Sequence, residues 1–171
     1  MCPKGDISFL EYVDKYLLLG TTTGEVFVID PKDEKVLLKD KLENKIRFLS
    51  YFKIDDDEYL IEAEESVMFV KKFGENMVEV DKIEFETNLL EICNTLKFQD
   101  QVYLLVACCD DLIHVFQLNP EVEFLNSLPG HKNKIKAISV KDIGNKNEAV
   151  FISGALDNYI RLWKIHRPEK I

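Results

Sequence analysis

Short apolar runs separated by turn residues recur along the whole chain, and no segment keeps a helical period of 3.6 residues. Three successive sets hold four runs each: 7–13, 16–22, 25–30 and 35–42, then 46–54, 58–64, 66–73 and 77–85, then 89–98, 101–109, 112–118 and 122–128. A fourth set holds only three runs, 134–141, 149–154 and 159–165. This recurrence predicts an all-β protein whose strands form four similar units.

The spacing of equivalent positions supports a structural repeat. The third runs align at Trp163, Phe116, Val70 and Ile29. Successive positions in this series are 47, 46 and 41 residues apart. The turn into that run lies six residues earlier in each case, at Asp157, Asp110, Glu64 and Thr23. The second run of each set is almost entirely apolar, which is typical of strands buried on both faces. A four-stranded unit with a period of about 40–45 residues predicts the blades of a β-propeller, which bury their faces against one another.

The stretch from Gly130 to Ile165 carries four separated features in one order. It opens with Gly130-His131, passes through two apolar runs, turns at Asp157-Asn158 and closes on Ile160-Arg161-Leu162-Trp163-Lys164. This layout resembles one repeat of the WD-repeat β-propeller family. The resemblance implies a hydrogen-bonded structural tetrad made of a histidine, a hydroxyl, a carboxylate and an indole, here His131, Ser153, Asp157 and Trp163.

The other three sets keep the WD-repeat pattern only in part. The third set has Asp110 at the corresponding turn, but Phe116 replaces the tryptophan, and Thr87 or Asn88 stands where Gly-His is expected. The first two sets have neither tryptophan nor histidine at these positions. We therefore expect the complete tetrad only in the last blade, with Asp110 as the equivalent turn residue of the blade before it.

The same histidine, serine and aspartate could also be interpreted as a hydrolase triad. No G-x-S-x-G sequence surrounds Ser153, and the tetrad position accounts for all three residue types. The acidic run Asp55-Asp56-Asp57-Glu58 suggests a solvated hairpin tip more than a metal site, since adjacent loop residues do not converge on one ion unaided. The sequence thus predicts a protein that is not an enzyme, with no cofactor and no catalytic or metal-binding residues.

The composition excludes several classes of partner. A net charge of -9 disfavours a dedicated nucleic-acid binder and docking on an anionic membrane. The polar start does not resemble a signal peptide, and the four cysteines form no C-x-x-C pair. We expect an intracellular protein, located in the cytoplasm, with the nucleus left open.

The run count predicts an incomplete propeller. We expect one β-propeller body over residues 1–171, with blades at about 7–42, 46–85, 89–128 and 130–165, the last lacking its outer strand. Such a body is either an open four-blade structure or part of a larger ring, and the second alternative is favoured. An open end exposes apolar blade faces and unpaired strand edges, so we expect another chain or segment to complete the propeller.

The resemblance also implies a function. WD-repeat propellers act as rigid scaffolds that bind several proteins, so the expected partners are the proteins of a multisubunit complex. Three stretches, CCDDLIHVFQL, SLPGHKNKIKAI and VFISGALDNYIRLWKI, resemble the double-propeller second subunits of the Elongator complex, which implies a scaffold in the assembly that modifies wobble uridines of transfer RNA. A WD-repeat adaptor for substrate recognition or signalling, in a ubiquitin ligase or in ribosome assembly, stays open as the alternative.

Overall fold

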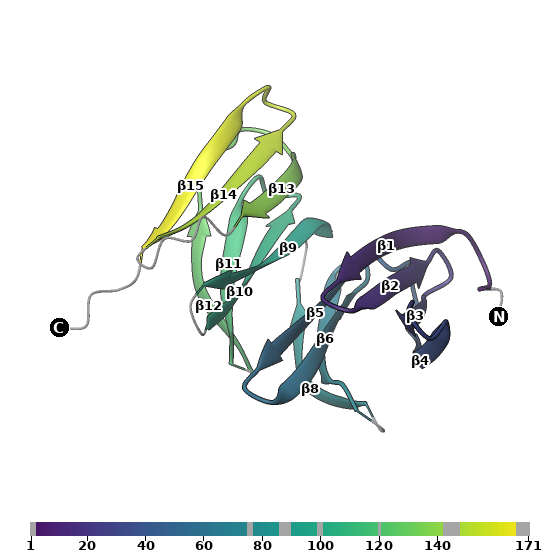
Figure 1. Cartoon of the computed structure of the whole chain (residues 1–171). Coiled ribbons are helices and arrows are strands. Elements are labelled where there is room, and N and C mark those ends of the chain that lie inside the picture. Colours follow the sequence, from purple (N-terminus) through teal and green to yellow (C-terminus); the bar gives the residue numbers. More distant parts are fainter. Residues whose placement is uncertain are drawn as a thin grey trace. The chain divides into compact units, whose positions relative to one another are not determined.

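A computed structural model describes residues 3–74, 77–85, 90–98, 101–119, 121–141 and 148–166. These residues form fifteen strands and no helix, so the prediction of an all-β chain is confirmed. The chain divides into two compact units, Met1–Leu89 and Leu90–Ile171, which are described separately (Figure 1). The placement of the four blades in one propeller body stays a prediction.

The first unit contains two four-stranded antiparallel sheets, each a meander in which neighbouring strands follow one another in the chain. The first sheet consists of β1 (Ile7–Val13), β2 (Tyr16–Thr21), β3 (Glu25–Asp30) and β4 (Lys35–Lys41). The second sheet consists of β5 (Phe48–Ile54), β6 (Asp57–Ala63), β7 (Val67–Lys72) and β8 (Val78–Glu84).

The second unit has the same plan, but in the described residues its last sheet has one strand fewer. The third sheet consists of β9 (Leu90–Phe98), β10 (Gln101–Cys108), β11 (Ile113–Asn119) and β12 (Glu121–Leu128). The fourth sheet consists of β13 (Ile135–Lys141), β14 (Glu148–Ala155) and β15 (Ile160–His166). Within the described residues β15 is therefore an edge strand, as predicted for a last blade without its outer strand (Figure 1).

In each unit the two sheets pack face to face over an apolar core. In the first unit, Leu18, Val26 and Val28 of the first sheet share a buried cluster with Leu49 and Leu60 of the second. The first strands of the two sheets also approach each other, and the Ser8 hydroxyl of β1 donates a 2.8 Å hydrogen bond to the carbonyl that precedes β5.

The core of the second unit is built in the same way. Leu105, Ile113 and Val115 of the third sheet pack with Ile138 and Phe151 of the fourth. The side-chain amide of Asn94 on β9 donates a 3.1 Å hydrogen bond to a backbone carbonyl of β13. In both units, strands with two apolar faces are thus covered on the side where a second sheet is present.

The connection between the second and third strands differs in length among the sheets. The last paired residues on either side of this turn are Gly20↔Val26, Ala63↔Met68, Ala107↔Ile113 and Gly154↔Ile160. The turn of the second sheet, between Ala63 and Met68, is therefore one residue shorter than the other three. The three longer turns share a residue with a positive φ, namely Gly24 at 85°, Asp111 at 63° and Asn158 at 66°. These residue types tolerate the left-handed conformation best.

The shorter turn corrects one sequence alignment. Counted from the closing pairs, the positions equivalent to Trp163 are Phe116, Ile29 and, in the second sheet, Lys71. The alignment of Val70 with Trp163 is wrong by one residue, because a missing turn residue advances the register of the third strand. By the same count, the position of Ser153 is occupied by Glu62 in the second sheet.

We predict that Gly24→Ala destabilises the first unit by about 2 kcal/mol or more. An added Cβ would lie 2.4 Å from the carbonyl oxygen of Leu42, and the φ of 85° is strained for alanine. The measurement is urea unfolding followed by far-UV circular dichroism. Gly154→Ala is the matched control, since its Cβ would meet only the Ala137 Cβ at 4.0 Å. Equal stability of the two variants would contradict the strained geometry.

Candidate functional site

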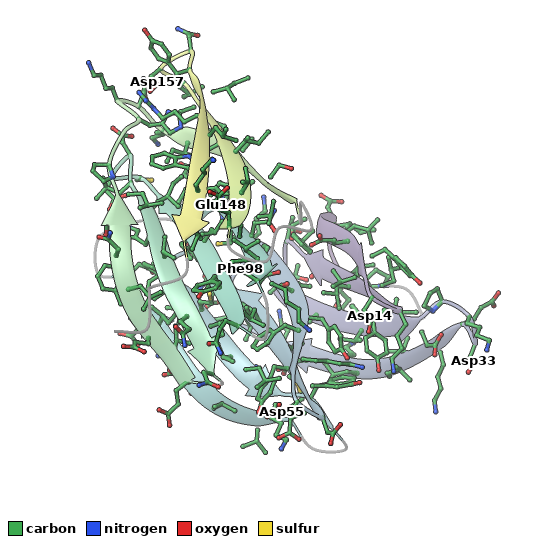
Figure 2. All side chains as sticks on the ribbon, turned by 60° about the vertical axis from the view of Figure 1, so that its left-hand side comes forward. Asp14, Asp33, Asp55, Phe98, Glu148 and Asp157 are labelled. Carbon is green, nitrogen blue, oxygen red and sulfur yellow. The ribbon has the colours of Figure 1, made fainter. Side chains whose placement is uncertain are left out.

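The fourth sheet brings the four predicted tetrad residues together from separate segments. His131 lies in the connection before β13, Ser153 on β14, and Trp163 on β15. Asp157 occupies the turn between β14 and β15, and Figure 2 labels it at that tip, with Glu148 at the opposite end of β14. The turn holds Asp157 in place because residue 158, with its positive φ, reverses the chain directly after it.

The four side chains form one continuous line of hydrogen bonds. His131 Nδ1 lies 3.0 Å from Asp157 Oδ2, and His131 Nε2 lies 2.7 Å from Ser153 Oγ. The indole Nε1 of Trp163 donates to the same Ser153 Oγ at 2.7 Å. An ionised carboxylate can only accept, so Nδ1 of His131 donates to Asp157. In a neutral ring Nε2 then accepts from the Ser153 hydroxyl, and the bonds run from the indole through the hydroxyl and the imidazole to the carboxylate.

Asp157 also receives two backbone hydrogen bonds. The N–H of Lys132 donates to Oδ2 at 2.9 Å, and the N–H of Tyr159 donates to Oδ1 at 3.0 Å. Burial alone would raise the pKa of Asp157, but these two donors and the His131 ring outweigh it and lower the pKa to about 2. The carboxylate therefore ties the segment before β13 to the β14–β15 turn.

Burial argues against the hydrolase interpretation of these residues. The His131 side chain is fully buried, and Ser153 is 2% exposed. The ring of Trp163 stacks on Phe151 at a centroid distance of 5.9 Å, so apolar packing flanks the hydroxyl. A nucleophile must be reachable by a substrate, whereas this hydroxyl is enclosed and hydrogen-bonded on two sides.

Asp110, the predicted turn residue of the third sheet, belongs to a second network. Its Oδ2 lies 2.8 Å from Nε2 of His114 on β11, and Nδ1 of His114 lies 2.8 Å from the Ser127 hydroxyl on β12. Asp110 Oδ1 accepts the backbone N–H of Leu112 at 3.2 Å. These bonds of Asp110 connect β11 and β12 with the turn before them, whereas Asp157 bonds to the segment before β13. Thr87 and Asn88, expected in place of Gly-His, lie outside the described residues.

The second sheet replaces the hydroxyl and indole by an ion pair. Lys71 Nζ lies 2.7 Å from Oε2 of Glu62 and 2.6 Å from Oδ2 of Asp40, which is on β4 of the first sheet. Glu62 is fully buried and the Lys71 side chain is 11% exposed. Burial raises the pKa of Glu62 to about 7, although the positive charge of Lys71 acts in the opposite direction. This charged cluster occupies the positions that Ser153 and Trp163 hold in the fourth sheet.

A cavity of about 540 Å³ opens beside this cluster in the first unit. Asp40 and Lys71 contribute to its wall, together with Leu38, Met77 and Glu79. Its lining mixes apolar and charged groups, and no group of three or more His, Cys, Asp or Glu gathers for a metal ion within the described residues. The part of the chain that the structure describes contains no helix long and apolar enough to cross a membrane.

Turn carboxylates fasten the start of the first two sheets as well. Glu64 Oε2 accepts the N–H of Asn44 at 2.8 Å, and Glu25 Oε2 accepts the N–H of Lys4 at 2.6 Å. In each case an acidic side chain near the turn holds the segment that enters the first strand, as Asp157 does with Lys132. The fastening therefore recurs even where histidine and tryptophan are absent.

Sequence reasoning missed the polar groups of the second and third sheets. His114 follows Asp110 by four residues, a spacing that allows contact across a tight turn, but Ser127 carries no sequence signal. Glu62 and Lys71 could have been suspected as charges within otherwise apolar runs. Their pairing depends on the shortened turn, which spacing alone does not reveal.

We predict that Asp157→Ala lowers the thermal unfolding midpoint of the second unit by roughly 5 °C or more, because three hydrogen-bond donors lose their acceptor. Trp163 is the only tryptophan, so its fluorescence reports unfolding at the site itself. The depressed pKa implies that this stabilisation is present above pH 4 and is lost as the pH falls towards 2. The exposed turn residue Asp33 provides the control, Asp33→Ala, which we expect to unfold like the wild type. A difference between wild type and Asp157→Ala that stays constant down to pH 2 would contradict the assignment.

We predict the opposite pH dependence for Glu62. Since its folded pKa is raised, the stability of the wild type falls as the pH rises from about 4.5 through 7. Glu62→Gln keeps an acceptor for Lys71 but removes the titration, so we expect a flatter profile and a more stable variant at pH 8. Thermal unfolding by far-UV circular dichroism measures both. Glu84→Gln, at a mostly exposed residue, should follow the wild-type profile. Parallel curves for wild type and Glu62→Gln would be inconsistent with a raised pKa.

Comparison with known proteins gives a result only at the level of structure. No protein-family profile matches the chain, and no curated protein matches it. Among solved structures, the computationally designed Ika4 protein superposes with a TM-score of 0.72 at 19% identity, over 96% of this chain and 94% of that chain. The β-propeller domain of Cps50 (Swd1) from Myceliophteria thermophila gives a TM-score of 0.70 at 14% identity, and the C-terminal WD40 domain of Sif2 gives 0.73 at 16%.

The coverage of the two propeller domains is unequal. This chain aligns over 93% and 98% of its own length, but it spans only 54% of the Cps50 (Swd1) chain and 48% of the Sif2 chain. Each of its sheets therefore corresponds to a blade, and the set amounts to about half of those structures. The chain has the all-β fold of WD40 β-propellers, and its described residues form four blade-like sheets, the last with three strands.

Proposed function

We propose that this chain is a non-catalytic protein-interaction scaffold in a multisubunit assembly. The observation that carries the proposal is the WD40 fold, which the similarity to the propeller domains of Cps50 (Swd1) and Sif2 supports. WD40 propellers typically bind other proteins through their rigid surfaces. The partners proposed here are complex subunits, including a chain or segment that completes the propeller.

The polar groups of the chain favour this role over catalysis. The His131, Ser153 and Asp157 side chains are enclosed and mutually bonded, which suits fastening of a blade more than turnover of a substrate. The tetrad and the Glu62–Lys71–Asp40 cluster are accordingly proposed as structural elements of the scaffold. A rigid blade edge presents its surface side chains in fixed positions, which lowers the entropic cost of binding.

The more specific proposal is membership of the Elongator complex, which acts in wobble-uridine modification of transfer RNA. It is supported by the sequence resemblance of the stretch from Cys108 to Ile165 to the second subunits of that complex. The proposed location is the cytoplasm, with the nucleus left open. The chain would then hold other subunits in place and would leave the chemistry to them. An adaptor in a ubiquitin ligase or in ribosome assembly is the alternative, because it makes the same use of a propeller surface.

Affinity purification of the tagged chain from its native cells, with quantitative mass spectrometry, tests these proposals. We expect stoichiometric recovery of the other Elongator subunits, at a level that resists washing with 0.3 M salt. An untagged strain and a tagged Gly24→Ala variant, predicted to be destabilised, are the controls. Recovery of a cullin adaptor or of pre-ribosomal proteins would replace the Elongator proposal by the alternative. Recovery of no protein above the untagged background would contradict the scaffold function itself.

A further inference from the structure

The fourth sheet exposes an apolar face. Phe151 and Trp163 point towards the third sheet, where they join the core of the second unit. Because side chains alternate along a strand, their neighbours Ile152 and Leu162 point to the other side, together with Ile160. These three side chains are 43%, 64% and 80% exposed, respectively. We call this surface, with Gly154, the forward face of the fourth sheet.

The third sheet shows what such a face does when a blade follows it. In the third sheet, Leu105 pairs with Val115 and Ala107 with Ile113. These pairs lie at the same positions as Ile152↔Leu162 and Gly154↔Ile160 in the fourth sheet. All four residues of the third sheet are buried in the core shared with the fourth sheet. The residue types are nearly the same in both sheets, and in the described residues no further sheet covers the face of the fourth.

The first unit repeats the arrangement. Leu18↔Val28 and Gly20↔Val26 are the corresponding pairs of the first sheet. Leu18, Val26 and Val28 are at most 1% exposed and pack in the core shared with the second sheet. A forward face of small and branched aliphatic residues is therefore covered by the next blade in each of the two units.

The first sheet exposes the complementary surface, which we call its backward face. Leu10 pairs with Leu19, and Tyr12 pairs with Leu17. The same pairing positions are occupied by Leu49 and Tyr51 in the second sheet and by Ile138 and Val140 in the fourth. Leu49 and Tyr51 are buried against the first sheet, and Ile138 is buried against the third. Leu10 and Tyr12 are instead 58% and 62% exposed.

We propose that a second copy of this chain covers both faces. The forward face of the fourth sheet in one copy packs on the backward face of the first sheet in the other, with the residue types that already meet between consecutive sheets of one chain. When each copy contributes both faces, the dimer satisfies both contacts and holds eight sheets. The chain spans about half of two solved propellers, so two copies together match their length. This inference rests on one part of the proposed function, since it names a second copy as the chain that completes the propeller; a monomer that still binds other proteins would refute the self-association and leave the scaffold role intact.

The direct test is the solution mass of the purified chain by sedimentation equilibrium between 1 and 100 µM. We expect twice the 19.9 kDa of one chain. Leu162→Glu and Leu10→Lys each place a charge in the proposed contact, and we expect either to weaken dimerisation by at least about 100-fold. Both residues are exposed in the single chain, so circular dichroism should show unchanged folding. Val78→Glu, at an exposed apolar residue of β8, is the matched control and should remain dimeric.

Mixing the two charged variants sharpens the test. In the proposed contact, residue 162 of one copy lies against residue 10 of the other. Val115 and Ile138 hold the equivalent positions in the third and fourth sheets, and both lie in the core of the second unit. A mixture of Leu162→Glu and Leu10→Lys offers one wild-type contact and one contact with opposite charges, so we expect a heterodimer where each variant alone is monomeric. A wild-type chain that stays at 19.9 kDa at 100 µM would overturn the proposal. Assemblies whose mass keeps growing with concentration, or a dimer that both charged variants leave intact, would also overturn it.

Discussion

A sheet with two apolar faces needs a neighbour on each side, and this requirement governs the whole chain. Leu18 and Leu105 lie on second strands that are apolar almost throughout, and each is covered by the sheet that follows in its unit. The hydrophobic gain depends on area removed from water, so a lone blade of this composition would expose as much as it buries. These strands are therefore stable only when their sheets stack. The first and the fourth sheet each keep one apolar face that no other sheet of the described chain covers.

Polar side chains hold the segment that leads into the first strand of a blade. The first strand of a blade is preceded by a connection in which some backbone N–H groups bond to strand carbonyls, as Ile46 and Arg47 do before β5, and others bond to acidic side chains. Asp157, Glu64 and Glu25 supply acceptors for these groups in the fourth, second and first sheets. Among the described residues, only the fourth sheet adds the His131–Ser153–Trp163 line, so the complete tetrad is one solution among several to the same bonding need.

The strands and their grouping could be predicted from the sequence because alternation and turn residues are local signals. The four residues His131, Ser153, Asp157 and Trp163 could be singled out because a family resemblance supplied their spacing. Lys71 was missed because the turn before its strand is one residue shorter than in the other sheets. An alignment by spacing alone therefore assigns each later residue of that strand to the wrong face of the sheet. Glu62, at the position of Ser153, lies before this turn and stands out as a charge in an apolar run, but its partner became visible only with the correct register. Ser127 could not be found at all, because a hydroxyl on an outer strand has no distinctive pattern.

The shortened turn of the second sheet has a consequence for how such a chain can evolve. Lys71 and Glu62 stand at positions that hold Trp163 and Ser153 elsewhere, and Lys71 also bonds to Asp40 of the first sheet. An exchange of blades by duplication or recombination would separate this lysine from that aspartate and would leave its nearly buried ammonium group with Glu62 as its partner. The repeats look modular, yet this ion pair couples the first two sheets, so a mutation at Asp40 also affects Lys71 and Glu62.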